Sequence, residues 1–171
     1  PDPGAETSAD AALLKPSVQL PLIMIVEYAL AQLWISWGVR PAAMVGHSMG
    51  ENTAACLAGV MSFEDCIDLV QLRGRLFDTV EPGGMLSISL PLAEVETLVG
   101  ADLDIASVNA PELTALSGPN DRLEALAEEL RARDVEFQRI PIDIAAHSRM
   151  LEPILAAYGD FLRRLDLQPP N

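Results

Sequence analysis

Apolar residues are distributed differently in the two halves of the chain. In residues 18–37 they cover most faces of a helix, which predicts a long helix packed deeply against a sheet. A short apolar run at 42–45 predicts a buried strand, and the Ala-rich segment 53–57 predicts the start of a second helix. Ser62, followed by two acidic residues, has the form of a helix N-cap and predicts a third helix over 63–80.

A turn at residues 81–84 separates these long helices from shorter alternating elements. The pattern that follows predicts strands at 85–90, 103–108, 113–117 and 136–142, and helices at 92–99 and 121–133. This βαββαβ order is that of a ferredoxin-like subdomain. Residues 149–165 predict a final helix, in which Pro153 is tolerated because it falls in the first turn. Residues 1–10 lack periodicity and predict an irregular start.

The predicted fold class is α/β. We expect an incomplete α/β subdomain, residues 1–82 and 143–171, into which a ferredoxin-like subdomain of residues 83–142 is inserted. The first subdomain shows a single convincing strand, whereas a parallel sheet needs neighbouring strands and covering helices. Its other strands are therefore either missed by the pattern or lie outside the 171 residues.

The junction between the predicted strand and the second helix carries a Gly-x-Ser-x-Gly motif, Gly46-His47-Ser48-Met49-Gly50. Such a motif forms a nucleophile elbow, in which a strained serine points its hydroxyl away from the sheet and glycines leave room for the turn. The helix that follows aims N–H groups and the positive end of its dipole at a developing oxyanion. A plain Gly-Ser turn would explain the motif by itself, but its context favours the elbow.

A serine hydroxyl needs a base before it can act as a nucleophile, and histidine is the usual one. His47 adjoins Ser48 in a turn where neighbouring side chains diverge, so His147, at the return from the ferredoxin-like subdomain, is the candidate base. Either Asp143 or a backbone carbonyl could orient the imidazole. Arg73 lies in an otherwise apolar helix, where an inward-facing guanidinium suits a carboxylate.

Composition narrows the possible partners. The 171 residues are 50% hydrophobic, enough for one good core or two small ones, and carry a formal net charge of -14. That charge argues against nucleic acid and anionic membranes. The 2 cysteines and 2 histidines lack metal-site spacing and predict buried thiols without a metal. Polar interruptions in residues 20–39 favour a buried helix over a membrane span, and the lack of a signal-peptide pattern favours the cytoplasm.

The combination of motifs resembles one family. The motifs are Gly46 to Glu51, Arg73, Asn109-Ala110-Pro111, Ser117-Gly118 and Ala146-His147-Ser148. Together they look like the acyltransferase domain of modular polyketide synthases, and they are similar to malonyl-CoA:acyl-carrier-protein transacylases of fatty-acid synthesis. The resemblance extends over nearly the whole chain, and the combination is specific although each piece alone is not.

The resemblance implies that residues 1–82 and 143–171 form a partial α/β-hydrolase-like (malonyl-transacylase-like) subdomain. It also implies an acyltransferase that works with a Ser-His dyad. Ser48 would form the acyl-enzyme, and His147, oriented by backbone carbonyls, would be its base. Arg73 would bind the free carboxylate of the extender unit, and the Met49 N–H would be one oxyanion donor. Further residues of the substrate site would be His47, Met49, Asn109, Ile144 and Ala146.

Selectivity and length depart from the family pattern. The sequence before His147 matches neither the HAFH-like pattern of malonyl-selective members nor the YASH-like pattern of methylmalonyl-selective members. Small Ala146 leaves space for a methyl branch, whereas Met49 replaces a glutamine common in methylmalonyl enzymes, so malonyl is favoured. Family members are nearly twice as long. Their first strand, whose Gly-Gln-Gly motif assists the oxyanion hole, and their last elements would lie outside these 171 residues.

The resemblance also implies the partners. Malonyl-CoA or methylmalonyl-CoA would be the substrate, with no bound cofactor, and the acceptor would be the phosphopantetheine thiol of an acyl carrier protein. Ketosynthase and other synthase domains would adjoin the chain. Two other hypotheses stay open: a serine esterase or patatin-like lipase with the same elbow, and a non-catalytic interaction core in which Ser48 is a structural turn.

Overall fold

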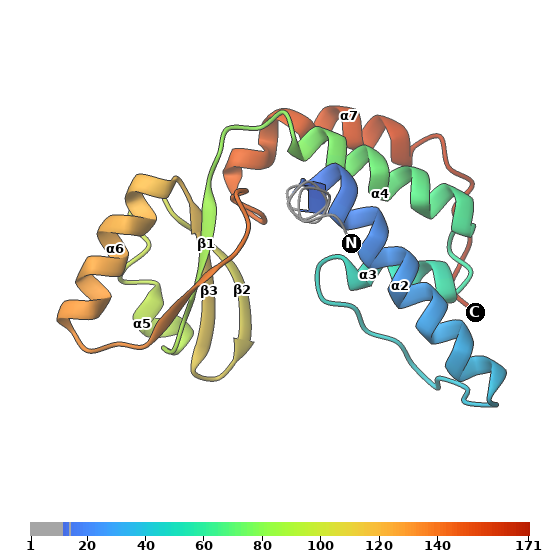
Figure 1. Cartoon of the computed structure of the whole chain (residues 1–171), viewed down its shortest axis with the longest axis horizontal. Helices are drawn as coiled ribbons and strands as arrows, with labels where there is room; N and C mark the ends of the chain where they lie inside the picture. Colours follow the sequence, from blue (N-terminus) through green and yellow to red (C-terminus); the bar gives the residue numbers. More distant parts are fainter. Residues whose placement is uncertain (1–11, 14) are drawn as a thin grey trace, which may run out of the picture. The chain divides into compact units, whose positions relative to one another are not determined.

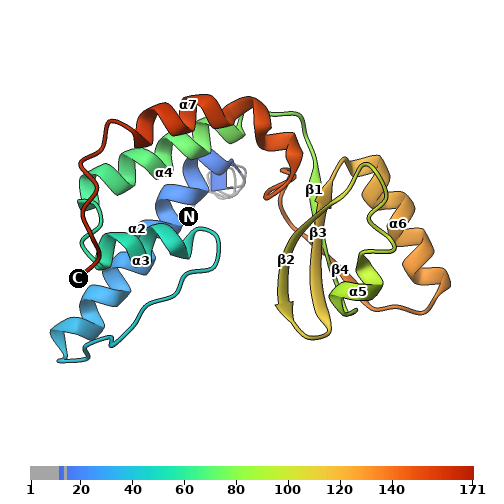
Figure 2. The same ribbon diagram turned by 180° about the vertical axis from the view of Figure 1, so that it is seen from behind.

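The computed structural model describes residues 12, 13 and 15–171, and the predicted irregular start at 1–10 lies outside this part. The chain forms two compact units. Unit 1 consists of Pro1–Thr79 and Ala156–Asn171, and unit 2 consists of Val80–Leu155. The described part of unit 1 is helical, whereas unit 2 contains the sheet (Figures 1 and 2).

Unit 1 confirms the predicted helices. They are α2 (Pro16–Ser36), α3 (Gly50–Leu57), α4 (Phe63–Phe77) and the C-terminal part of α7 (Glu152–Leu162). The predicted cap at Ser62 is also confirmed, because its Oγ accepts the Asp65 N–H at 3.0 Å. Local patterns of apolar and capping residues therefore identify the helices of this unit.

The helices of unit 1 pack around a small core. α2 and α4 approach closely at Gly74, where a Cβ would lie 2.6 Å from the Pro16 carbonyl oxygen. The Thr53 hydroxyl donates a 2.6 Å hydrogen bond to the Glu27 carboxylate, which ties α3 to α2. The buried core residues are Met24, Met49, Cys56, Cys66 and Val70. This core supports the segment that precedes α3.

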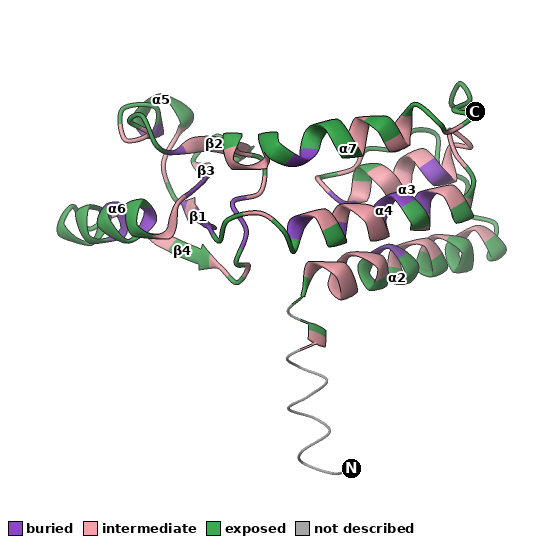
Figure 3. Ribbon diagram, turned by 90° about the horizontal axis from the view of Figure 1, so that it is seen from above, coloured by how far each residue is buried: buried purple, intermediate pink, exposed green. Residues whose placement is uncertain are grey.

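The prediction that residues 18–37 are deeply buried is wrong. Met24 is buried, but much of α2 is exposed (Figure 3). Its exposed large apolar side chains are Leu22, Ile23, Ile25, Val26, Leu30, Leu33 and Trp34. The apolar pattern shows that a helix needs other apolar side chains packed against it, but it does not show which element provides them. Here the expected sheet is not part of unit 1 as described, since all four paired strands belong to unit 2.

By length and apolar composition α2 could also cross a membrane. These two properties are weak evidence for a span, because core helices of other proteins share them. In this chain Met24 packs in the core of unit 1, and Glu27 is hydrogen-bonded to Thr53. One face of α2 is thus engaged with α3 and α4.

Residues 42–45 do not form the predicted strand. The backbone between α2 and α3 lacks a β-ladder there, and Val45 is 97% exposed. A strand needs a hydrogen-bonded neighbour, and every strand of the described residues pairs within unit 2. The apolar run has the composition of a strand, but a local sequence pattern does not show which other strand it would pair with.

Unit 2 confirms the predicted βαββαβ order. Its elements are β1 (Gly84–Ile88), α5 (Leu92–Val95), β2 (Asp104–Ala110), β3 (Leu113–Gly118), α6 (Asn120–Ala132) and β4 (Phe137–Ile140). The strand order is β2-β3-β1-β4 with antiparallel neighbours. This is a small ferredoxin-like sheet with β1 between β3 and β4.

The two faces of this sheet differ. Leu86 of β1 lies opposite Leu116 of β3, and both belong to the core shared with α5 and α6. Side chains alternate along a strand, so the next pair, Met85 and Ser117, lies on the other face. Asp104 of β2 pairs with Ser117. A carboxylate is therefore placed on the face that is turned away from the helices.

After β4 the chain stays with unit 2 as far as Leu155. The Gly83 N–H donates a 3.3 Å hydrogen bond to the Asp143 carbonyl, and Ile144 and Ala145 are buried. The sequence prediction assigned residues from 143 onward to the first subdomain. In the structure residues 143–155 pack with unit 2, and the division falls within α7.

Candidate active site

Ser48 lies in a tight turn directly before α3. Its φ of 52° falls in the left-handed region, which a residue with a side chain adopts only under constraint. The Gly50 N–H donates to the His47 carbonyl at 3.0 Å, and the Glu51 N–H donates to the Ser48 carbonyl at 3.2 Å. Because α3 begins at Gly50, the positive end of its dipole lies beside the serine.

The two glycines of the motif are not equivalent. A Cβ on Gly46 would lie closer than 3.0 Å to backbone atoms of Gly50 and Glu51, whereas a Cβ on Gly50 would meet nothing within 4 Å. We expect Gly46→Ala to destabilise the protein by about 1–3 kcal/mol through overpacking. The matched variant Gly50→Ala should be neutral or stabilising, because alanine favours helix. Urea unfolding measures both, and equal stabilities would contradict the close packing at Gly46.

Met49 offers its backbone rather than its side chain to this turn. The side chain is buried in the core of unit 1, in the same cluster as Cys66 and Val70 of α4. The Asn52 side-chain amide donates to the Met49 carbonyl at 3.3 Å. A role for Met49 at the substrate would thus rest on its N–H, and the selectivity argument drawn from its side chain loses its basis.

Arg73 lies on α4 one turn beyond Val70, which belongs to the same core cluster as Met49. Its guanidinium carbon is 5.2 Å from the centre of the Phe77 ring. In the part of the chain that the structure describes, none of the ion pairs to a carboxylate includes Arg73. This arginine is therefore a cation without a salt-bridge partner in the described chain, on the helix that packs against the Ser48 turn.

The electrostatic surroundings of Arg73 connect it to the motif. Burial lowers the pKa of Arg73, while Tyr158 and Glu51 act in the opposite direction. A guanidinium stays protonated in proteins, so the site holds a partly desolvated positive charge. Burial raises the pKa of Tyr158, against the effect of the Arg73 charge. The sequence did not single out Tyr158, because it occupies an ordinary apolar position of the last helix.

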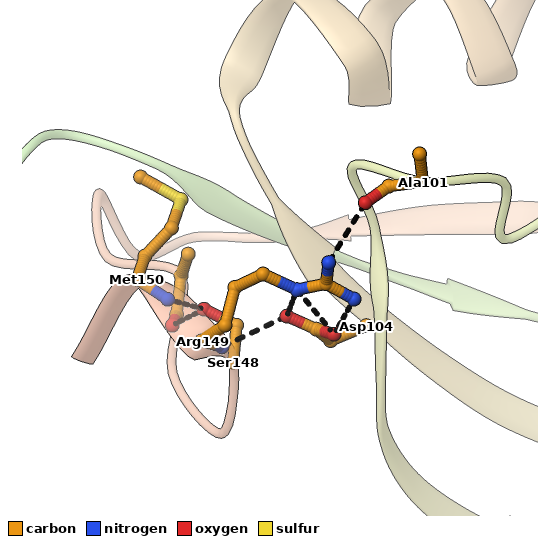
Figure 4. A network of polar contacts seen from close by, with 6 residues as sticks. Ala101, Asp104, Ser148, Arg149 and Met150 are labelled. Atoms are coloured by element: carbon orange, nitrogen blue, oxygen red, sulfur yellow. Dashed lines mark hydrogen bonds and ion pairs between the residues drawn. The ribbon is translucent and has the colours of Figure 1, made fainter. Parts of the chain in front are cut away.

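His147 lies in unit 2, between β4 and the short 3-10 helix η1 (Arg149–Leu151). Its φ of 59° is left-handed, as for Ser48, and the residue is exposed. The Ser148 hydroxyl donates to the Ala145 carbonyl at 2.7 Å and accepts the Met150 N–H at 3.2 Å (Figure 4). His147, the candidate base, therefore lies in a constrained turn.

The other predicted site residues differ in exposure. Ile144 is buried and Ala146 is half-buried, both in unit 2. Asn109 is exposed on β2, which extends beyond its predicted end. His47 is exposed in unit 1, next to Ser48. Unit 1 therefore carries the serine, the arginine and His47, and unit 2 carries the candidate base and the motif before it.

Cys56 and Cys66 are free and buried, as predicted. Burial raises the pKa of Cys66 to about 12, and its thiol donates to the Asn52 carbonyl at 3.4 Å. A buried thiol that keeps its proton is a poor nucleophile and a poor metal ligand. Among the residues that the structure describes, no group of 3 or more His, Cys, Asp or Glu side chains could hold a metal ion.

Comparison with known proteins assigns the family. Residues 10–170 match the acyl transferase domain family. The chain is 38% identical over 174 residues to the PKS-NRPS hybrid synthetase acdB of Aspergillus candidus. It is also 38% identical over 166 residues to polyketide synthase GfsE of Streptomyces halstedii. The chain therefore belongs to the acyl transferase domain family.

The matched proteins are longer than this chain. The two alignments cover 98% and 94% of the chain but only 7% and 4% of the synthases. The crystal structure of the acyl transferase domain of SpnD in complex with 2-(pent-4-yn-1-yl)malonyl superposes with a TM-score of 0.86 at 38% identity. That match covers 91% of this chain and 38% of the SpnD chain. The chain thus shares the α/β fold of polyketide synthase acyltransferase domains over part of their length.

Proposed function

We propose that this chain carries the nucleophile, the base and the carboxylate-binding arginine of an acyltransferase that loads extender units from CoA. The observation that carries the proposal lies in unit 1. There the left-handed Ser48 turn at the start of α3 lies in the same unit as the partly desolvated Arg73. A generic serine hydrolase has no task for such an arginine, whereas a dicarboxylate-acyl transferase does.

The proposed chemistry has two half-reactions. The His147 imidazole takes the proton from Ser48 Oγ as that oxygen attacks the thioester carbonyl. The Met49 N–H and the start of α3 stabilise the tetrahedral oxyanion. The C–S bond then breaks, the CoA sulfur receives the proton from the imidazolium, and an ester remains on Ser48. In the second half-reaction the carrier phosphopantetheine thiol attacks this ester, and the serine regains its proton through His147.

Arg73 selects the acyl group in this account. Its planar fork pairs with the free carboxylate of a malonyl-type unit, and reduced solvation strengthens such a pair. The similar SpnD domain was solved with a substituted malonyl group, which supports a dicarboxylic substrate. We propose malonyl as the favoured unit, with methylmalonyl as the alternative for which the small Ala146 leaves space.

The partners follow from the same relationship. The synthases that this chain resembles are many times longer than the matched region. We therefore infer an acyl carrier protein domain as acceptor, with ketosynthase and other synthase domains beside it, and no tightly bound cofactor. The buried free cysteines fit a reducing compartment, so we propose the cytoplasm.

Transfer to a carrier protein tests the function. The full-length protein is incubated with malonyl-CoA and a phosphopantetheinylated acyl carrier protein, and malonyl-carrier and free malonate are followed by mass spectrometry. We expect malonyl-carrier to form much faster than malonate, and Ser48→Ala to abolish its formation. Rapid release of malonate together with hydrolysis of simple esters would instead identify an esterase or patatin-like lipase. If neither malonyl-carrier nor free malonate forms, the result would favour a non-catalytic core.

A further inference from the structure

Arg149 anchors the segment that carries His147. Its backbone N–H donates to Asp104 Oδ2 at 2.8 Å, and its Nη2 donates to Asp104 Oδ1 at 2.7 Å. Its Nη1 donates to the Ala101 carbonyl at 2.8 Å (Figure 4). The main chain and the side chain of one residue therefore bind the same carboxylate, which fixes both the position and the direction of the backbone after Ser148.

Asp104 is itself held by the sheet. It begins β2 and pairs with Ser117 of β3, on the face away from α5 and α6. Its side chain is 21% exposed, against 56% for that of Arg149, so the carboxylate is the more buried partner. The hydrogen bond from Arg149 lowers the pKa of Asp104. The anchor point is thus an ionised group on a paired strand.

The other end of the segment is also attached to unit 2. The Gly83 N–H donates to the Asp143 carbonyl at 3.3 Å, and a Cβ on Gly83 would lie 2.7 Å from the Ala145 Cβ. His147 lies between these two fixed ends with its left-handed φ of 59°. A non-glycine residue keeps such a conformation only where its surroundings hold it there.

We propose that Asp104 and Arg149 are positioning residues that hold the His147 turn and thereby orient its imidazole for proton exchange with Ser48, an inference that rests on the proposed function. In this proposal both residues act through the His147 turn and not on the reacting atoms. A displacement of about 1 Å in a catalytic group costs roughly 10²-fold in rate. Loss of the contact between Asp104 and Arg149 should therefore slow the chemical step. Substrate binding should change little, because other residues provide it.

The test measures single-turnover loading of Ser48 from malonyl-CoA in the full-length protein. For Asp104→Ala and for Arg149→Ala we expect the rate constant to fall roughly 10- to 100-fold. The malonyl-CoA concentration for half-maximal rate should change little. Arg149→Lys keeps the charge and the backbone N–H and should recover part of the rate. The loss in the double variant should be smaller than the product of the two single losses, because the two residues share the contact between their side chains.

Hydrogen exchange of the amides in residues 143–149 supplies a readout independent of activity. We expect faster exchange in both single variants. The Arg149 contact holds the Asp104 pKa below its ordinary value of about 3.9, so the anchor is fully present above that pH. It is lost only as the pH falls through the lowered pKa. Protection in the wild type should therefore persist from neutral to mildly acidic pH.

Arg122→Ala is the matched control. It removes an exposed ion pair in the same unit, from Arg122 Nε to Asp102 Oδ2 at 3.3 Å, and should leave loading and exchange at wild-type values. If the wild type loads Ser48 and the Asp104 and Arg149 variants load equally fast, the positioning role is wrong while the proposed function stands. If the wild type forms no Ser48 ester, both are overturned.

Discussion

Arg73→Ala is expected to slow malonyl loading of Ser48 by about 10²-fold or more while acetyl loading stays within a few-fold of wild type. Removing one partner of a desolvated charge pair costs about 2–5 kcal/mol, and about 1.4 kcal/mol corresponds to a factor of ten. Acetyl-CoA has no free carboxylate, so its loading rate should not depend on the Arg73 guanidinium. Loading rates for the two thioesters, measured side by side in the full-length protein, give the ratio.

Arg75→Ala is the control for Arg73, two residues further along α4. Arg75 is exposed and its guanidinium bonds to the Gln71 side chain at 2.7 Å, so its removal should affect neither thioester. Arg73→Lys should fall between the wild type and Arg73→Ala, since an ammonium keeps the charge without the planar fork. An equal loss with malonyl-CoA and acetyl-CoA in Arg73→Ala would show that Arg73 supports the fold rather than the carboxylate.

His147→Ala is expected to slow Ser48 loading by about 10²- to 10⁴-fold, the usual contribution of a positioned general base. Single-turnover loading from malonyl-CoA in the full-length protein measures the rate constant. A His147→Ala protein that loads Ser48 as fast as the wild type would contradict the assignment of the base.

His47→Ala separates the two histidines of the chain. His47 lies beside Ser48, and its removal is expected to change the apparent affinity for substrate while the rate constant at saturating substrate stays within a few-fold of wild type. If the rate constant fell steeply in His47→Ala and stayed near wild type in His147→Ala, the assignment of the base would be reversed, and the proposed reaction would have to be rebuilt around unit 1.

Much of the secondary structure could be predicted because its signals are local. Leu123, Leu126 and Leu130 recur at helical spacing on α6, and all three are buried against the sheet of unit 2. The exposed face of α2 and the unpaired segment around Val45 could not be predicted in the same way. Burial of a helix and pairing of a strand depend on another element, which a local pattern does not specify.

The residues of the candidate site also differ in whether the local sequence could predict them. The serine turn and Arg73 were recognisable from residue type and context, and the left-handed Ser48 agrees with a constrained turn. The contact between Arg149 and Asp104 was not recognisable, because 45 residues separate the partners and each is common on protein surfaces. Tyr158 was missed for a related reason, since only packing brings its hydroxyl under the influence of Arg73.

The central claim is that Ser48 forms a covalent ester with a dicarboxylic acyl group. The most direct measurement incubates the full-length protein with malonyl-CoA in the absence of carrier protein, then identifies the modified residue by tandem mass spectrometry of its peptides. We predict a malonyl ester on Ser48, absent from Ser48→Ala and removed when phosphopantetheinylated carrier protein is added. A wild-type protein that carries no acyl group at Ser48, or that carries it on another residue, would contradict the account.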